Sequence, residues 1–207
     1  MNKPKLTVFA SGSKTGGGSG FENLVKASRN GILDAEIRVV SSRENTGVKK
    51  IADELGVPFT YSAGPWTKET YQELAKGSDF VALSGWLKLV TGLDPRTTFN
   101  IHPGPLPRFG GERMYGHYVH EAVIEAFNRG EITHSAVTMH FVTEKFDEGP
   151  VFFRKAIEII PGDTADSLSA RVNTVEHLYQ PIVTDAVLKG KIWWDGKNPD
   201  SLHSIYI

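Results

Sequence analysis

The residues best suited to chemistry are an amide and an imidazole two positions apart, Asn100 and His102, directly ahead of Pro103. Side chains two apart on a strand point to the same face, so these two would lie side by side at a strand end. An amide donor beside an imidazole can polarise a carbonyl group and move its proton. The alternative is a core histidine whose ring nitrogen bonds a backbone carbonyl. We treat the pair as a candidate catalytic site.

A carboxylate that could join this pair is Asp147, in the stretch Phe146-Asp147-Glu148-Gly149-Pro150. A carboxylate near an imidazole favours its charged form and can take up a proton through water. An aspartate ahead of a Gly-Pro turn can equally be a turn former. His140 and Thr138, on one face of the preceding strand, could add polar groups to the same place.

A glycine-rich turn, residues 11–20, lies between the first strand and the first helix. Such a turn in an open parallel sheet is where phosphates bind, on backbone N–H groups and a helix N-terminus. The turn lacks the Gly-Lys-Ser/Thr ending of a P-loop, and its glycines do not form the Gly-x-Gly-x-x-Gly of dinucleotide sites. We predict an anion site rather than the alternative, a flexible surface loop.

Metal chemistry has little support in the sequence. His117 and His120 have a helical i,i+3 spacing that can chelate zinc, but no third ligand follows at a motif spacing. The chain has no cysteine, which excludes a disulfide framework, a thiolate nucleophile and a cysteine-based metal site. We therefore predict no metal.

The elements that must position these residues follow an α/β pattern. Strands are predicted at 6–10, 37–40, 59–61 and 80–83, and helices at 21–29, 48–55 and 68–75. This alternation predicts an open, mostly parallel twisted sheet with helices on both faces. A fifth strand, 98–102, would carry the amide and the imidazole. Strands at 135–142 and 151–159 are close enough to form an antiparallel addition in the C-terminal half, with a helix at 117–129 before them.

A long helix is predicted to start at a cap at Asp163 or Thr164 and to reach Leu188. Its apolar stripe at helical spacing would face the core. The stripe comprises Leu168, Val172, Val175, Tyr179, Ile182 and Val187.

Length and charge limit the function classes. A chain of 207 residues is long enough for one self-sufficient domain. Lysine and arginine number 23 against 24 acidic residues, which argues against a nucleic-acid or anionic-membrane partner. No apolar run approaches the roughly 18 residues of a membrane span. We expect a soluble, cytoplasmic protein of one domain, acting on small molecules as a monomer or homodimer.

Taken together, these motifs resemble the phosphoribosylglycinamide formyltransferase family, the small folate-dependent enzymes of purine synthesis. The resemblance covers about Leu6 to Trp194 in order and spacing. It is carried by Asn100-Ile101-His102-Pro103 with Leu106-Pro107, by His140-Phe141-Val142-Thr143 with Asp147-x-Gly149-Pro150, and by Arg171-Val172-x-x-x-Glu176-His177. The family implies a Rossmann-like formyltransferase fold and transfer of formyl from 10-formyltetrahydrofolate to the amine of 5-phosphoribosylglycinamide.

The resemblance also implies roles for single residues. Asn100, His102 and Asp147 match the catalytic trio. The N-terminal half would bind the substrate, and its phosphate would contact Ser11, Gly12, Ser13, Gly18, Ser19 and Gly20. Asn173 and Glu176 would contact the sugar and glycinamide end. The C-terminal half would carry catalysis and folate binding. Folate would contact Lys68, Leu87, Lys88, Leu89, Val90, Asn100, His140, Thr143, Glu144, Lys145, Phe146 and Asp147. His117 aligns with a histidine at the site edge.

The sequence departs from the family at two loops. The glycine-rich loop is about four residues longer than usual, with Gly20 in place of an asparagine, and residues 110–116 are an insertion beside the site. This insertion could alter amine specificity. Two alternatives therefore stay open: a folate-dependent formyltransferase for another amine, an amino sugar or methionyl-tRNA, and a non-catalytic nucleotide-binding module of the same fold.

Overall fold

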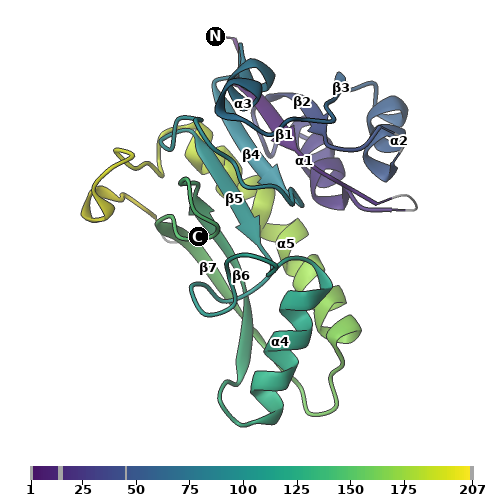
Figure 1. Cartoon of the computed structure of the whole chain (residues 1–207), viewed down its shortest axis with the longest axis vertical. Coiled ribbons are helices and arrows are strands. Elements are labelled where there is room, and N and C mark those ends of the chain that lie inside the picture. The colour runs from purple at the N-terminus through teal and green to yellow at the C-terminus, as the bar shows by residue number, and fades with distance from the viewer. Residues whose placement is uncertain (1, 14–15, 45, 206–207) are drawn as a thin grey trace.

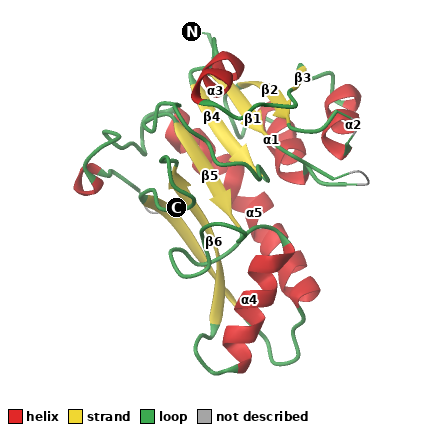
Figure 2. Ribbon diagram, viewed as in Figure 1, coloured by secondary structure: helices red, strands yellow, loops and turns green. Residues whose placement is uncertain are grey.

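The computed structural model describes residues 2–13, 16–44 and 46–205. Its centre is a seven-stranded sheet with helices packed against it (Figures 1 and 2). The strands are β1 (Lys5–Phe9), β2 (Glu36–Ser41), β3 (Phe59–Tyr61), β4 (Phe80–Ser84), β5 (Thr98–His102), β6 (His134–Phe141) and β7 (Val151–Glu158). The α-helices are α1 (Ser19–Arg29), α2 (Gly47–Glu54), α3 (Lys68–Ala75), α4 (His117–Asn128) and α5 (Ala165–Leu188).

The sheet has the strand order β3-β2-β1-β4-β5-β6-β7. The pairs from β3 to β5 are parallel, whereas β6 runs antiparallel to β5 and β7 antiparallel to β6. This confirms the predicted mostly parallel sheet with an antiparallel addition. Because parallel strands end at one edge, the loops after β1, β4 and β5 meet there, and this is the edge at which open α/β sheets bind ligands.

Helices cover both faces of the sheet, as predicted. Alternate residues of β1 serve the two faces, since Leu6 and Val8 belong to a large core with α1, α2, α4 and α5, while Phe9 belongs to a second core with α3. The second core is aromatic, and the rings of Phe9 and Trp86 meet edge to face at 5.1 Å. The loop that follows β4 is thereby fixed to the sheet by Trp86.

The long helix α5 begins where predicted, but the set of side chains on its buried face differs from the predicted set. Thr164 is its cap and forms a capping box with Ser167, so the predicted start is confirmed. The predicted stripe is wrong at Ile182, which is 41% exposed, whereas Gln180 is buried. The reason is a polar contact, because the Gln180 amide donates to Ser84 Oγ at 3.1 Å at the end of β4. The helix thus turns a polar side chain toward the ligand-binding edge of the sheet.

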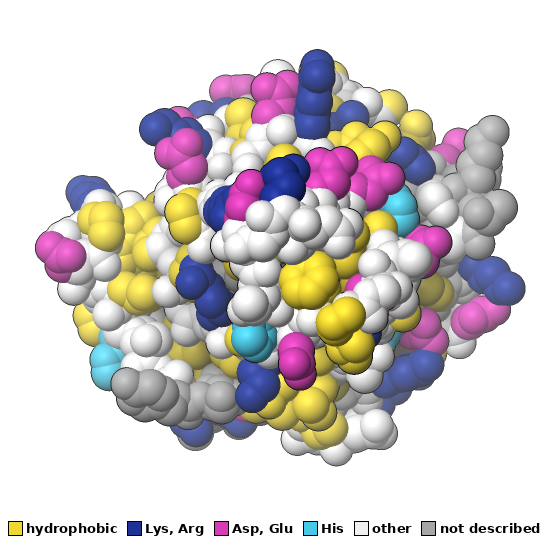
Figure 3. Space-filling view, turned by 90° about the horizontal axis from the view of Figure 1, so that it is seen from below, with side chains coloured by type: hydrophobic (Ala, Val, Ile, Leu, Met, Phe, Trp, Pro, Cys, Tyr) yellow, Lys and Arg dark blue, Asp and Glu magenta, His cyan; other side chains and the backbone are white. Residues whose placement is uncertain are grey.

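The surface mixes charges of both signs. In the view from below, basic and acidic side chains are interspersed and hydrophobic ones gather near the middle (Figure 3). In the described part of the chain, no helix is both long enough and apolar enough to span a bilayer.

Candidate active site

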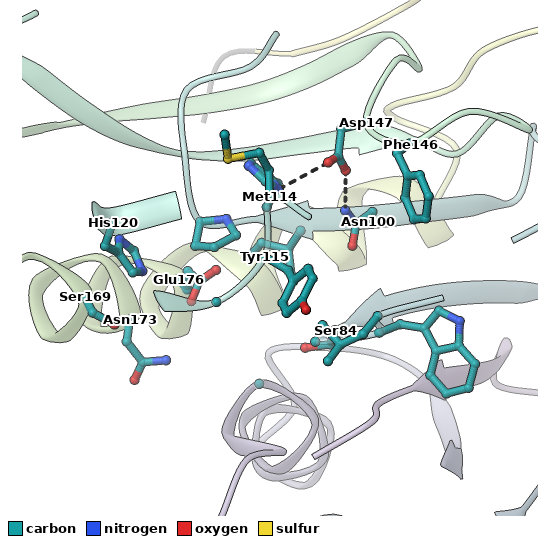
Figure 4. Close-up of a pocket in the computed structure, with 18 of the residues that line it drawn as sticks. Ser84, Asn100, Met114, Tyr115, His120, Phe146, Asp147, Ser169, Asn173 and Glu176 are labelled. Carbon is teal, nitrogen blue, oxygen red and sulfur yellow. Dashed lines mark hydrogen bonds and ion pairs between the residues drawn. The ribbon is translucent and has the colours of Figure 1, made fainter. Parts of the chain in front are cut away.

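The carboxyl edge of the sheet opens into a cavity of about 470 Å³, here called the main cavity (Figure 4). Its walls come from segments far apart in the sequence, which converge where the strands end. They include the start of α1, the ends of β4 and β5, the loop before α4, the turn at Asp147, and the inner side of α5. The lining residues proposed from the sequence are Gly18, Ser19, Gly20, Leu87, Asn100, His102, Phe146, Asp147, Asn173 and Glu176.

The amide of Asn100 connects two other predicted site residues. Asn100 and His140 are cross-strand partners on β5 and β6, and a register shift follows Met139. The Asn100 amide donates to His140 Nε2 at 3.1 Å and to Asp147 Oδ1 at 3.4 Å. His140 Nδ1 donates to the Phe141 carbonyl at 2.8 Å, which orients its ring. Because the contact with Asp147 is long, the same amide can turn to a substrate oxygen.

His102 is buried, and its ring is held by one hydrogen bond. Its Nε2 donates to the Phe109 carbonyl at 2.7 Å, and its Nδ1 lies 3.7 Å from Asp147 Oδ2. Burial lowers the pKa of His102 and outweighs the opposing effects of the Asp147 charge and the Phe109 carbonyl. Asp147 thus favours the charged imidazole of His102, as expected, but in the free protein desolvation favours the neutral ring more strongly.

Asp147 combines the two roles considered for it. Its φ of 54° places it in the left-handed region, as a turn aspartate. Gly149 completes the turn, because a Cβ there would lie 1.7 Å from the Phe141 carbonyl oxygen. The carboxylate nevertheless points into the site and accepts from the Gly111 N–H at 3.0 Å. Burial would raise the pKa of Asp147, but its contacts with the imidazoles of His140 and His102 and with the Gly111 N–H together lower it.

The glycine-rich loop divides into two parts. Gly18, Ser19 and Gly20 line the main cavity at the start of α1, where backbone N–H groups lack helical partners. Residues 11–13 lie outside the cavity lining, and the buried Ser11 hydroxyl accepts from the Leu87 N–H at 3.3 Å. That part fixes the loop to the segment after β4. Lys14 and Thr15, also in this turn, lie outside the described residues.

The far wall of the main cavity is polar. Ser169, Asn173 and Glu176 of α5 gather there with His120 of α4 (Figure 4). Burial lowers the pKa of His120 to about 4, with smaller contributions from the imidazoles of His117 and His102, and this favours the neutral ring. Burial raises the pKa of Glu176 to about 7, although Asn173 opposes the shift through a hydrogen bond. This wall therefore carries neutral donors and one carboxyl that titrates near neutrality.

We expect Glu176→Gln to change the pH dependence of stability. An unfolded Glu176 ionises near pH 4.5, but the folded one does so only near 7, so wild-type stability falls as pH rises through this window. Gln has no charge to bury, so the variant should gain of the order of 2 kcal/mol at pH 8 and nothing at pH 4. Thermal unfolding from pH 4 to 8 measures this, with Glu73→Gln on the surface of α3 as control. Parallel profiles for wild type and Glu176→Gln would contradict it.

The predicted folate walls line two smaller pockets next to the main cavity. A narrow pocket of about 50 Å³ shares Trp86, Asn100, Phe146 and Asp147 with the main cavity. An outer pocket of about 270 Å³ shares Val90, Val142 and Thr143 with the narrow one. The predicted residues lining these two pockets are Lys88, Leu89, Val90, Asn100, His140, Thr143, Glu144, Lys145, Phe146 and Asp147.

Two further predicted residues, besides Ser11, Gly12 and Ser13, lie outside the lining of these cavities. His117 is half exposed and faces Glu121 and Asp166 at 3.5 and 3.4 Å. Lys68 begins α3 and packs its methylene groups on Gly92, which lines the outer pocket. Among the described residues, no group of three histidine or acidic side chains is arranged to hold a metal ion.

Several lining residues were missed from the sequence. They include Ser84, Trp86, Arg113, Met114, Tyr115, His120, Ser169 and Gln180. Ser84 is the last residue of the parallel strand β4, and that position alone could have indicated a ligand-binding residue. Arg113, Met114 and Tyr115 belong to the insertion 110–116, for which the sequence predicted no individual roles. His120 was considered only as a metal ligand. Apart from His120, none of these residues belongs to a motif with a chemical meaning of its own.

Comparison with known proteins identifies the fold. The family described as "Formyl transferase" matches residues 5–184. The solved glycinamide ribonucleotide transformylase 1 of Symbiobacterium toebii superposes with a TM-score of 0.80 at 26% identity, over 99% of this chain and 95% of that one. Its fold is thus shared across nearly the whole of both chains.

Two plant proteins are similar in sequence. The chloroplastic phosphoribosylglycinamide formyltransferase of Arabidopsis thaliana is 33% identical over 97% of this chain and 74% of its own length. That of Vigna unguiculata is 34% identical over 94% of this chain and 64% of its own length. The chain therefore spans somewhat less than two thirds of the second relative.

Proposed function

The chain belongs to the formyl transferase family, and within it to the phosphoribosylglycinamide formyltransferases, and from that premise we propose that it formylates the glycinamide amine of 5-phosphoribosylglycinamide. The formyl donor is 10-formyltetrahydrofolate, and the step belongs to de novo purine biosynthesis. The observation that carries the proposal is the main cavity, which joins the start of α1 to Asn100, His102 and Asp147.

The proposal extends to the setting of the reaction. The chain forms one formyltransferase domain that acts on small molecules in the cytoplasm, as a monomer or homodimer. The glycine-rich loop and the polar wall of α5 bind the phosphoribosyl substrate. The narrow and outer pockets take the folate, whose flat ring offers donors and acceptors that suit a mostly apolar slot with a few polar groups.

The neutral His102 gives the reaction a proton acceptor. The substrate amine attacks the formyl carbon, and its proton passes to His102 Nδ1, since Nε2 is occupied by the Phe109 carbonyl. Asp147, 3.7 Å from Nδ1, stabilises the imidazolium that forms. The Asn100 amide donates to the oxyanion on the former carbonyl. Collapse of this intermediate returns the proton to the leaving folate nitrogen, so that the formylated amine and tetrahydrofolate are released.

An assay with several amines tests the proposed function. The purified protein is mixed with 10-formyltetrahydrofolate and with phosphoribosylglycinamide, an amino sugar or methionyl-tRNA, and folate absorbance is followed. We expect turnover with phosphoribosylglycinamide alone. Preference for another amine would support the first alternative, and substrate binding without formyl transfer would support a non-catalytic module.

We expect Lys68→Glu to weaken binding of folates that carry a glutamate tail. Lys68 lies beside the outer pocket, where its ammonium group can pair with the tail carboxylates. Reversing this charge should raise KM for such folates about fivefold or more, as for an exposed ion pair turned repulsive. A glutamate suits the first turn of α3, so folding should be kept. Measuring KM for a folate without the tail provides the comparison.

Lys76→Glu is the matched control, since Lys76 follows the same helix and faces Glu73 at the surface. It should leave both KM values unchanged. An equal rise in KM for folates with and without the tail in Lys68→Glu would remove Lys68 from the proposed site.

A further inference from the structure

A short segment between the Pro107 turn and α4 covers part of the main cavity. We call this segment, residues 111–116, the strap. Met114 and Tyr115 lie between the Asp147 end and the Glu176 end of the cavity (Figure 4). The Gly111 N–H donates to the Asp147 carboxylate at 3.0 Å, so the first residue of the strap is hydrogen-bonded to the turn that carries Asp147.

The strap holds Arg113 in a strained backbone conformation. Its φ is 69°, and among the described residues the only other non-glycine with a positive φ is Asp147. An arginine in this region costs conformational free energy that a glycine would not, and such strain concentrates at functional sites. Both strained residues line the main cavity. The main cavity thus has a charged side chain at a position whose backbone conformation favours glycine.

Arg113 also has the charge that the main cavity otherwise lacks. Among the described lining residues it is the only lysine or arginine, whereas Glu112, Asp147 and Glu176 are acidic. The two lining histidines have lowered pKa values and supply no positive charge near neutral pH. An anion entering this cavity would meet net negative charge if Arg113 were absent.

The guanidinium of Arg113 is available for a ligand. Within the described part of the chain it makes no hydrogen bond or ion pair, and the residue is exposed. The nearby Arg108, by contrast, pairs with Glu131. A planar guanidinium with free N–H groups suits bidentate binding of a phosphate.

We propose that Arg113 binds the phosphate group of the substrate, together with the backbone N–H groups at the start of α1, since both line the main cavity. This inference rests on the proposed function, since it assumes a phosphoribosyl substrate in the main cavity. Gly20 cannot supply a side chain for the same purpose, because a Cβ there would meet Ser84 Oγ. Arg113 is therefore a specificity-determining residue that selects phosphorylated amines.

Arg113→Gly gives a test in which binding and stability move independently. KM for phosphoribosylglycinamide should rise roughly 10- to 100-fold, the loss expected for a charge-assisted contact. The melting temperature should stay equal or increase, because glycine relieves the strain at φ 69°. KM for the folate should not change, and Arg113→Lys should recover part of the affinity. Arg108→Ala, outside the cavity lining, is the control for loss of a positive charge.

The dephosphorylated substrate, glycinamide ribonucleoside, separates phosphate binding from other effects. Arg113→Gly should leave KM for this analogue unchanged, and equal losses for both substrates would overturn the inference. An unchanged KM for the phosphorylated substrate would overturn it too. Ribose 5-phosphate binding, followed by calorimetry, distinguishes the two proposals. If binding depends on Arg113 but no amine is formylated, the proposed function fails and the inference holds.

Discussion

Replacing His102 by alanine should lower kcat by about 10³-fold, with KM values for both substrates changed by less than tenfold. His102 is buried at the end of β5, where its Nε2–H is fixed by the Phe109 carbonyl and its Nδ1 faces Asp147. Alanine removes the proton acceptor but leaves the walls of the cavity. Its loss acts on the path to the transition state rather than on ground-state binding. Steady-state kinetics with both substrates measure the effect.

The pH profile adds a second readout for His102. Because burial lowers its pKa, kcat/KM of the wild type should fall on the acid side only below pH 6.5, the ordinary histidine value. His117→Ala is the matched control, since this surface histidine pairs with Glu121 and Asp166 outside the cavities. It should retain wild-type kcat. Near-normal kcat in folded His102→Ala would remove His102 from the mechanism.

The fold was predictable because its signals are local. Apolar runs and the Thr164 cap each act within a few residues, and the predicted bounds of α3 and β5 and the predicted end of α5 agree with the structure. The error at Ile182 has a non-local cause. Helical spacing cannot reveal that α5 must turn Gln180 toward Ser84, because that contact joins residues 96 positions apart.

The site was predictable only where residues share a motif. Alternation on β5 placed Asn100 beside His102, and the resemblance brought Asp147 to them. The protonation of His102 was not predictable, because it depends on how far burial outweighs a nearby carboxylate. Arg113 lines the main cavity because of the backbone conformation of residues 111–116. This segment is a loop, so no periodic sequence pattern could predict its conformation.

Asp147→Asn is the second change expected to have a large effect. It keeps the shape of the side chain, and asparagine tolerates the φ of 54° at this turn. It removes the charge that stabilises the His102 imidazolium once the amine proton has moved. We expect kcat to fall by roughly 10²-fold or more, with small changes in KM, as for the loss of a group acting in proton transfer. Glu148→Gln, an exposed neighbour that pairs with Lys145, is the matched control and should be silent.

The double change separates catalysis from turn formation. His102 and Asp147 act on the same proton, so adding Asp147→Asn to His102→Ala should cost far less than the product of the two single losses. A residue that only forms the turn would behave differently. Asparagine serves such a turn almost as well, so the single variant would keep normal turnover per folded molecule. Multiplicative losses in the double variant would show that Asp147 works independently of His102, since a shared proton requires both groups at once.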